Sequence, residues 1–239
     1  AEVDEDGKIT INGKEVKKIM VDGKEVFAND TKMSMKNIPT KMVKNIKAYD
    51  KQSDYSRVTG IDDGEEETVL DLTVKKGMKQ GWLVNLEGGY GTKDRYTVKG
   101  DVMRILDNTQ FALFAGSNNV NDRSMGGGGR WSRGGSGIVS SQMVGANLAW
   151  ENGKRDYEAG LLKTGGSVRF HRTFSESMSR SNSETFLQDM SKWNNSLSTG
   201  ENLNWSINAD FRLEWMPDSM TNIIFRPSYS HSEGNSESM

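Results

Sequence analysis

Residues 203–215 alternate strictly between apolar and polar side chains. The odd positions are all apolar, from Leu203 to Trp215, and the even positions are all polar or charged, from Asn204 to Glu214. Because successive side chains of a strand point to opposite faces, the pattern predicts a strand with one wholly apolar face. At a rise of about 3.3 Å per residue and a tilt of about 40°, such a strand covers roughly 33 Å, enough to cross a bilayer.

Aromatic residues support a membrane interpretation of this strand. Trp205 and Trp215 lie near the two ends of its apolar face, where outer-membrane strands carry aromatic girdles. Weaker alternation predicts six further strands, at residues 81–90, 95–106, 110–115, 144–150, 157–161 and 223–229.

The predicted connections on one side are all short, and two of the three on the other side are long, the exception being the short turn at residues 91–94. Short turns at residues 107–109, 151–154 and 217–220 separate long loops near residues 117–137 and 175–200. In bacterial outer-membrane barrels the short turns face the periplasm. About seven strands is an odd number, so residues 80–239 are expected to form the first part of a transmembrane β-barrel that further chain completes.

Residues 1–79 differ in character, since they are rich in charge and contain only Phe27, Tyr49 and Tyr55 as aromatics. Asn12-Gly13 and Asp22-Gly23 predict tight hairpin turns. The other elements expected here are a helix from Asp30 to Asn37 ended by Pro39, a second helical segment from Thr40 through Met42, Val43 and Ile46, and a strand at residues 68–74. The region is therefore predicted to be an α+β, plug-like domain on the periplasmic side.

Composition argues against several functions. The formal net charge is −2, with 31 basic and 33 acidic residues, which gives no electrostatic basis for binding nucleic acid. The chain has no cysteine, and His171 and His231 are far apart, so we expect no metal site and no cofactor. The mean hydropathy of −0.70 does not exclude transmembrane strands, because half of their residues are polar. No signal peptide is visible, so an earlier segment is expected to have been removed or left out.

Four local motifs are more simply explained by structure than by chemistry. The glycines at 126–129 lack the Gly-Lys-Ser/Thr ending of a phosphate loop and predict an outer loop. The acidic run at 62–67 lacks the ligand spacing of a calcium loop and predicts a solvated turn. His171 has no nucleophile or carboxylate pair beside it, and the serines at 175–183 have no base in register. We therefore predict no catalytic residue and no enzymatic activity.

The alternation predicts that four arginines lie on the polar faces of strands: Arg104, Arg169, Arg212 and Arg226. In a barrel they would point into the lumen, where they could pair with carboxylates of the plug or line a substrate path. Pairing with the plug is the interpretation that the sequence favours, and no substrate-binding residue can be named from it.

Several motifs resemble one known family. They are VDEDGKITINGK at 3–14, VDGK at 21–24, NIP at 37–39, TGIDDG at 59–64, KKG at 75–77 and GGYG at 88–91. Together they are similar to the TonB-dependent-receptor-like outer-membrane proteins of Bacteroidota, nearly continuously over residues 3–122 and more loosely beyond. The resemblance implies a longer protein with a signal peptide, a further N-terminal domain, a plug and a complete barrel, with any TonB-coupling segment upstream of this chain.

These observations predict an outer-membrane receptor or transporter with an internal plug, which takes up a ligand across the Gram-negative outer membrane. Its expected partners are outer-membrane lipid, TonB through the upstream segment, and a nutrient whose identity the sequence leaves open. One alternative is a non-transporting surface barrel or adhesin that binds partners through long outer loops. Another is a soluble all-β carbohydrate-binding or hydrolytic domain, in which Trp205, Phe211 and Trp215 would be buried under a second sheet.

Overall fold

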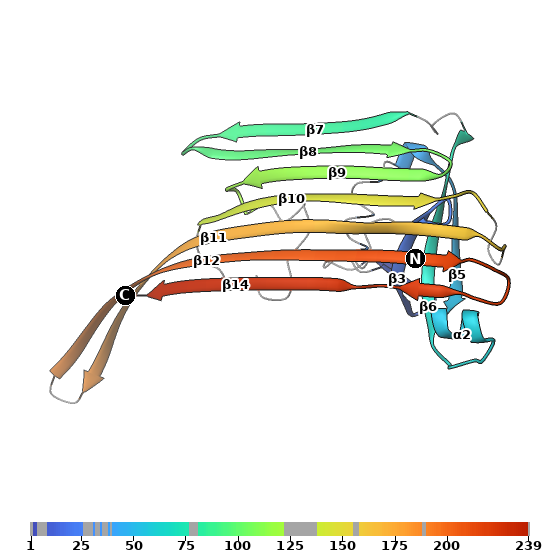
Figure 1. Cartoon of the computed structure of the whole chain (residues 1–239). Coiled ribbons are helices and arrows are strands. Elements are labelled where there is room, and N and C mark those ends of the chain that lie inside the picture. Colours follow the sequence, from blue (N-terminus) through green and yellow to red (C-terminus); the bar gives the residue numbers. More distant parts are fainter. Residues whose placement is uncertain are drawn as a thin grey trace.

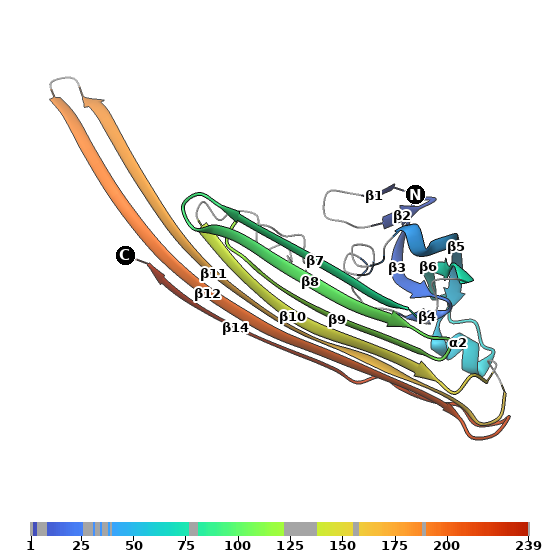
Figure 2. The same cartoon turned by 90° about the horizontal axis from the view of Figure 1, so that it is seen from above.

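Two β-sheets make up almost the whole protein. The computed structural model describes residues 2–3, 9–25, 31, 34, 38, 40–76, 81–121, 138–154, 158–187 and 190–238. Strand accounts for 75% of the structure and helix for 6%. The smaller sheet lies against one end of a long, curved sheet, on its concave side (Figures 1 and 2).

The N-terminal sheet has the strand order β1-β2-β3-β6-β5, with β4 paired to β3. Its strands are β1 (Glu2–Val3), β2 (Ile9–Ile11), β3 (Lys14–Val21), β4 (Lys24–Glu25), β5 (Val43–Gln52) and β6 (Glu66–Val74). β3 and β6 are parallel, and the other pairs are antiparallel. The predicted turns at Asn12-Gly13 and Asp22-Gly23 are confirmed, because all four residues have φ between 48° and 80°.

The expected α+β plug is wrong, because the N-terminal region is a β-sheet. The helical elements with bounds there are η1 (Thr40–Met42) and α2 (Asp54–Thr59), and Thr31 and Ser34 are helical as well. The segment from Val43 through Ile46, predicted as helix, begins β5, since β-branched and aromatic side chains favour pairing with the exposed edge of β6. Of the predicted helix from Asp30 to Asn37 the structure describes only Thr31 and Ser34, and both are helical, with the backbone N–H of Ile38 donating to the carbonyl of Ser34 at 3.2 Å. Pro39 and the domain boundary near Lys79 fall outside the described residues.

The long sheet is a continuous antiparallel meander with the order β13-β12-β11-β10-β9-β8-β7, and β14 also pairs with β12. Its strands are β7 (Trp82–Gly91), β8 (Arg95–Ile105), β9 (Thr109–Asn118), β10 (Ile138–Glu151), β11 (Leu161–Leu187), β12 (Met190–Met216), β13 (Ile223–Phe225) and β14 (Ser228–Ser238). In the part of the chain that the structure describes, β7 lies at one edge and does not pair with β14. The sheet is therefore open and curved. The expectation of barrel strands is corrected, because the described strands form no closed barrel.

Two predictions along the long sheet need correction. The strand expected at 157–161 begins instead at Leu161, because Ala159 and Gly160 form a turn and Gly160 has a φ of 80°. The long loop expected at 175–200 is mostly strand, since β11 and β12 pair without a break from Leu161↔Met216 to Leu187↔Met190. Serine and asparagine made this segment resemble a loop, but they alternate with larger side chains and fit a ladder exposed on both faces.

One hydrophobic core joins the two sheets. Ile19, Val21 and Leu72 of the N-terminal sheet belong to the same buried cluster as Met103 and Phe114 of the long sheet. Phe114 is 4% exposed and Val21 is fully buried. The N-terminal sheet thus uses the concave face of the long sheet as the second layer that its own apolar face needs.

Candidate functional site

The convex face of the long sheet is a continuous apolar surface. The ladder joins Val84, Val102, Leu113, Ala146, Val168, Ala209 and Tyr229 in one row across the strands. The next row in the direction of Trp205 contains Leu86, Val144, Phe170 and Ile207. Leu86 is 82% exposed and Tyr229 is 60% exposed. In the described residues, this face has no protein layer over it.

Tryptophans lie near the end of this face that adjoins the N-terminal sheet. Trp82, Trp150 and Trp215 occur close to that end of β7, β10 and β12. Toward the other end, Trp205 packs between Phe170 and His231, with ring centroids 6.3 Å and 5.1 Å away. Trp205 and Trp215 are ten residues apart on β12, which corresponds to about 33 Å along the strand and about 25 Å of height at a tilt of about 40°.

Between the Trp205 row and the N-terminal sheet, the concave face of the same sheet carries most of the charges. Lys99, Lys163, Arg169, Asp210 and Glu214 all occupy this register. On the convex side between the Trp205 row and the N-terminal sheet, Arg104 is the one charged side chain among the described residues. Its guanidinium lies 4.9 Å from the ring centre of Trp82, so the charge rests on an aromatic face.

A buried carboxylate connects the two sheets. Glu214 of β12, 1% exposed, accepts hydrogen bonds from Arg57 of α2 at 2.6 Å and from Arg212 at 2.9 Å. Arg212 also contacts Glu25 of β4 at 3.4 Å, and Arg57 contacts Asp54 at 3.3 Å. A buried charge is tolerated when it is paired and hydrogen-bonded, and both carboxylate oxygens of Glu214 meet that condition.

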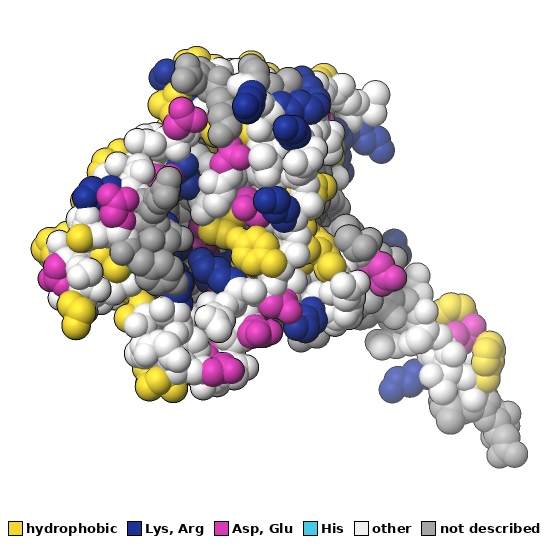
Figure 3. Space-filling view, turned by 90° about the vertical axis from the view of Figure 1, so that its right-hand side faces the viewer, with side chains coloured by type: hydrophobic (Ala, Val, Ile, Leu, Met, Phe, Trp, Pro, Cys, Tyr) yellow, Lys and Arg dark blue, Asp and Glu magenta, His cyan; other side chains and the backbone are white. Residues whose placement is uncertain are grey.

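Further ion pairs and hydrogen bonds between the N-terminal region and the long sheet lie on both sides of Glu214. Arg226, after β13, forms an ion pair with Asp54 at 2.5 Å. Lys24 donates to the carbonyl of Asp107 at 2.5 Å and lies 3.1 Å from Glu151. Figure 3, a view onto the end of the molecule where the N-terminal sheet lies, shows basic and acidic side chains interspersed over it. We call the set of Glu25, Asp54, Arg57, Arg212, Glu214 and Arg226 the ionic cluster.

The charges of the ionic cluster shift the pKa of two groups in the N-terminal region, Asp54 of α2 and Lys51 of β5. Burial alone would raise the pKa of Asp54, but the charges of Arg226, Arg212 and Arg57 together lower it below the usual value. Burial, followed by the nearby charges of Arg212 and Arg57, lowers the pKa of Lys51. The site thus stabilises ionised carboxylates and opposes additional positive charge.

The structure separates the four arginines that the sequence analysis grouped together. Arg212 and Arg226 pair with carboxylates of the N-terminal region, Glu25 of β4 and Asp54 of α2, although this region is not the α+β plug that was expected. Arg169 also lies on the concave face, opposite Asn208 in the ladder. The assignment of Arg104 to the polar face is wrong, because its register places it beside Trp82 on the convex face.

The remaining motifs show no catalytic arrangement in the described residues. His171 lies 3.4 Å from the hydroxyl of Ser141 on the concave face. In the acidic turn, Asp63 accepts hydrogen bonds from Ser53 and Ser56, which hold its pKa below the usual value. No group of three or more potential metal ligands occurs in the described part of the chain. The glycines at 126–129 lie outside the described residues.

The pairing of Arg57 with Glu214 was not predicted from the sequence. They are 157 residues apart, and α2 was not predicted. A partial signal existed, since Glu214 is flanked by Leu213 and Trp215 on a strand whose polar face was correctly identified. The partner could not be found without knowing which part of the N-terminal region covers that face.

Comparisons with known proteins leave the family open. No model of a known protein family matches the chain. No curated protein sequence matches it either. Among the described residues, no helix is both long and apolar enough to span a membrane.

Proposed function

We propose that the chain is part of an outer-membrane receptor or transporter of the TonB-dependent-receptor-like kind, with the convex face of the long sheet against lipid. The observation that carries this proposal is the uncovered apolar face, which extends over all strands of the long sheet. Soluble monomers rarely expose contiguous apolar patches larger than a few hundred Å², whereas this face continues from β7 to β14.

The distribution of charge supports the same proposal. Outer-membrane strands alternate apolar residues toward lipid with polar residues toward the interior. The long sheet has this alternation, with Leu86 on one face and Glu87 on the other. The aromatic side chains near both ends of the apolar band, such as Trp215 and Trp205, fit the two boundaries between lipid and water.

The position of the N-terminal sheet indicates its side of the membrane. It contacts the ends of the strands that the short turns join, through Lys24 at Asp107 and through Gln110, which donates to the carbonyl of Val21 at 2.7 Å. Because short turns of outer-membrane strands face the periplasm, the N-terminal sheet would lie at the periplasmic end. There it covers the polar face, and its rearrangement would control passage of a ligand.

Tryptophan quenching by lipids with brominated acyl chains tests the proposal. A variant that keeps Trp215 as its sole tryptophan should be strongly quenched in vesicles. A matched variant that keeps Trp193 alone, on the part of β12 beyond the apolar band, should be quenched far less. Equal quenching, or a protein that stays monodisperse and folded in plain buffer with Trp215 already shielded from water, would contradict the lipid assignment.

A surface-binding protein is the second candidate, and one observation favours it. The tip of the β11–β12 hairpin exposes Phe186 and Trp193, which are 77% and 67% exposed. A protein that binds partners outside the membrane would use such a projection. The soluble all-β alternative is less well supported, because Phe211 and Trp215 are 43% and 44% exposed where that alternative needs them covered.

A further inference from the structure

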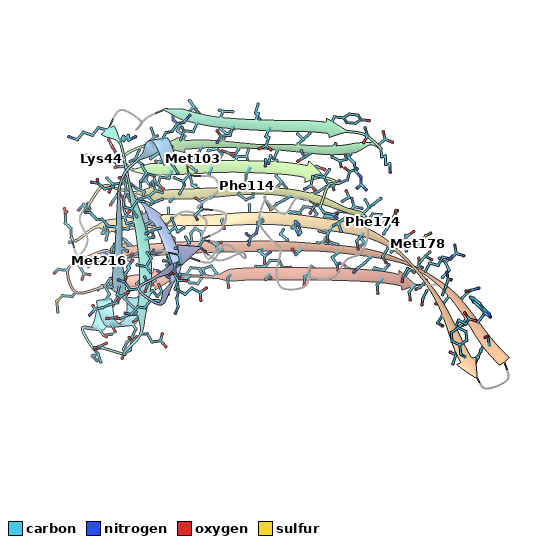
Figure 4. The ribbon with its side chains drawn as sticks, turned by 180° about the vertical axis from the view of Figure 1, so that it is seen from behind. Lys44, Met103, Phe114, Phe174, Met178 and Met216 are labelled. Atoms are coloured by element: carbon cyan, nitrogen blue, oxygen red, sulfur yellow. The ribbon has the colours of Figure 1, made fainter. Side chains whose placement is uncertain are left out.

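The β11–β12 hairpin projects beyond its neighbours as a two-stranded ribbon. β10 reaches only as far as Glu176, and β14 reaches only Gly200. Among the described residues, 177–187 and 190–199 therefore pair only with each other, over about 36 Å of strand. Figure 2 shows this ribbon curving away from the sheet, and Figure 4 marks Phe174 and Met178 near its base.

One face of the ribbon carries large and charged side chains. It continues the convex face, because β11 and β12 keep an unbroken register. From base to tip, its ladder pairs are Met178↔Thr199, Arg180↔Leu197, Asn182↔Asn195, Glu184↔Trp193 and Phe186↔Ser191. Met178, Phe186, Trp193 and Leu197 are each at least 61% exposed. Figure 3 shows hydrophobic, basic and acidic side chains together on this projection. The opposite face is mostly serine, threonine and asparagine.

This face is complementary to itself. Asn182 and Asn195 form its central row, and a two-fold axis through that row, lying across the strands, superposes each strand on its own copy in reverse. Arg180 then meets Glu184 of a second copy, Leu197 meets Trp193, and Met178 meets Phe186, each contact occurring twice. The other two-fold arrangement, with the axis along the strands, would place Arg180 on Leu197 and Glu184 on Trp193.

We propose that the projecting ribbon is a homodimerisation surface, which binds the same face of a second copy of this chain in antiparallel orientation. The pairing of opposite charges and of apolar residues selects this occupant and this orientation. The face measures about 30 Å by 10 Å, or on the order of 300 Å² per copy. A standard stable interface buries about 800 Å² per partner, so the dimer is weak and concentration-dependent. The proposal does not depend on whether the long sheet contacts lipid.

Cysteine crosslinking of the full chain provides the test, because the natural sequence contains no cysteine. Asn182→Cys places a thiol at the two-fold axis, where a short bismaleimide should join two copies. Asn194→Cys is the matched control, since Asn194 is also exposed but lies on the opposite face. The proposal expects a dimer band for Asn182→Cys that increases with protein concentration, and at most a trace for Asn194→Cys.

Charge exchange distinguishes this dimer from unspecific contact. In the Asn182→Cys background, Arg180→Glu and Glu184→Arg should each reduce crosslinking by about tenfold, because each replaces two attractive contacts by two repulsive ones. The double exchange should restore it. Circular dichroism checks that each variant keeps its strand content. Equal crosslinking at Asn182 and Asn194, crosslinking that does not change with charge, or a double exchange that fails to restore it would overturn the proposal.

Discussion

The N-terminal sheet and the long sheet have the same local pattern, alternating apolar and polar side chains, but they treat their apolar faces differently. In the N-terminal sheet, Val21 and Leu72 are buried in the core shared with the long sheet, at 0% and 4% exposure. In the long sheet, Leu86 and Trp82 remain 82% and 60% exposed on the convex side. Alternation therefore specifies a strand with an apolar face, whereas the surroundings of that face depend on what lies over it.

The concave face of the long sheet is partly buried by protein and carries both apolar and charged contacts to the N-terminal region. Near the N-terminal sheet it contributes Met103 and Phe114 to the shared core, and beside them it contributes Glu214 to the ionic cluster. A substitution on this face should therefore change folding stability, while a substitution on the convex face should change interaction with lipid.

Phe114→Ala should have the largest effect. The side chain is 4% exposed within the shared core, and truncation of a buried phenylalanine costs about 3–5 kcal/mol of unfolding free energy. Denaturant unfolding followed by circular dichroism measures it. Phe225→Ala, at a residue that is 55% exposed, serves as the control and should cost far less. Equal losses would show that the N-terminal sheet does not pack on the concave face.

Glu214→Gln should cost about 3 kcal/mol, because it leaves Arg57 and Arg212 without their shared buried carboxylate. The matched control is Glu87→Gln, which removes the ion pair of a 64%-exposed carboxylate with Lys99 on the same sheet. Exposed pairs contribute about 0–1 kcal/mol. The same unfolding measurement applies. If Glu214→Gln loses no more unfolding free energy than Glu87→Gln, the ionic cluster does not stabilise the fold.

Leu86→Lys distinguishes the convex face from the concave face in lipid. A lysine on the lipid side of an outer-membrane strand costs about 2 kcal/mol or more near mid-membrane, so association with vesicles should weaken by more than about tenfold. Glu87→Lys changes the next residue on the opposite face and should leave vesicle association nearly unchanged. Co-flotation with vesicles measures the association. If Glu87→Lys weakened it more than Leu86→Lys, the concave face and not the convex face would be the one that contacts lipid.

Lowering the pH should have the smallest effect of the four changes on the unfolding free energy, through the ion pair of Asp54. The pKa of Asp54 is lowered in the folded protein, so its ion pair contributes stability above the unfolded aspartate pKa of about 3.9 and loses it as the pH falls through the lower folded pKa. Asp54→Asn should therefore make stability less dependent on pH in the acid range below about pH 4. If the variant and the parent lose stability in parallel there, Asp54 is not the group responsible.

The sequence predicted much of the long sheet for a physical reason. The alternation at 203–215, the turns at Asp107 and Pro217, and β7 and β8 are local patterns, and their structural consequences are local too. The ribbon was misinterpreted as a loop because serine and asparagine are typical of loops, although β11 and β12 stabilise each other through their ladder. β5 was misinterpreted because its partner β6 lies more than a dozen residues away in sequence.

The ionic cluster was predictable only in part. Arg212 and Arg226 were expected to pair with carboxylates of the N-terminal region, and their partners Glu25 and Asp54 come from that region. The identity of those partners could not be derived, because the relevant distance in sequence is 187 residues for Arg212 and Glu25. Contacts of that separation are set by how the two sheets dock, which no local pattern encodes.

The span of these contacts has a consequence for the order of folding. Arg57 meets Glu214 across 157 residues, so this second carboxylate partner, besides the nearby Asp54, does not exist until β12 has been made. Pairing at such separation is slow, because a large loop must close before any contact compensates for the lost entropy. The apolar face of the N-terminal sheet is thus expected to stay exposed until the long sheet has formed. A chaperone that covers this face during that time should raise the yield of folded protein.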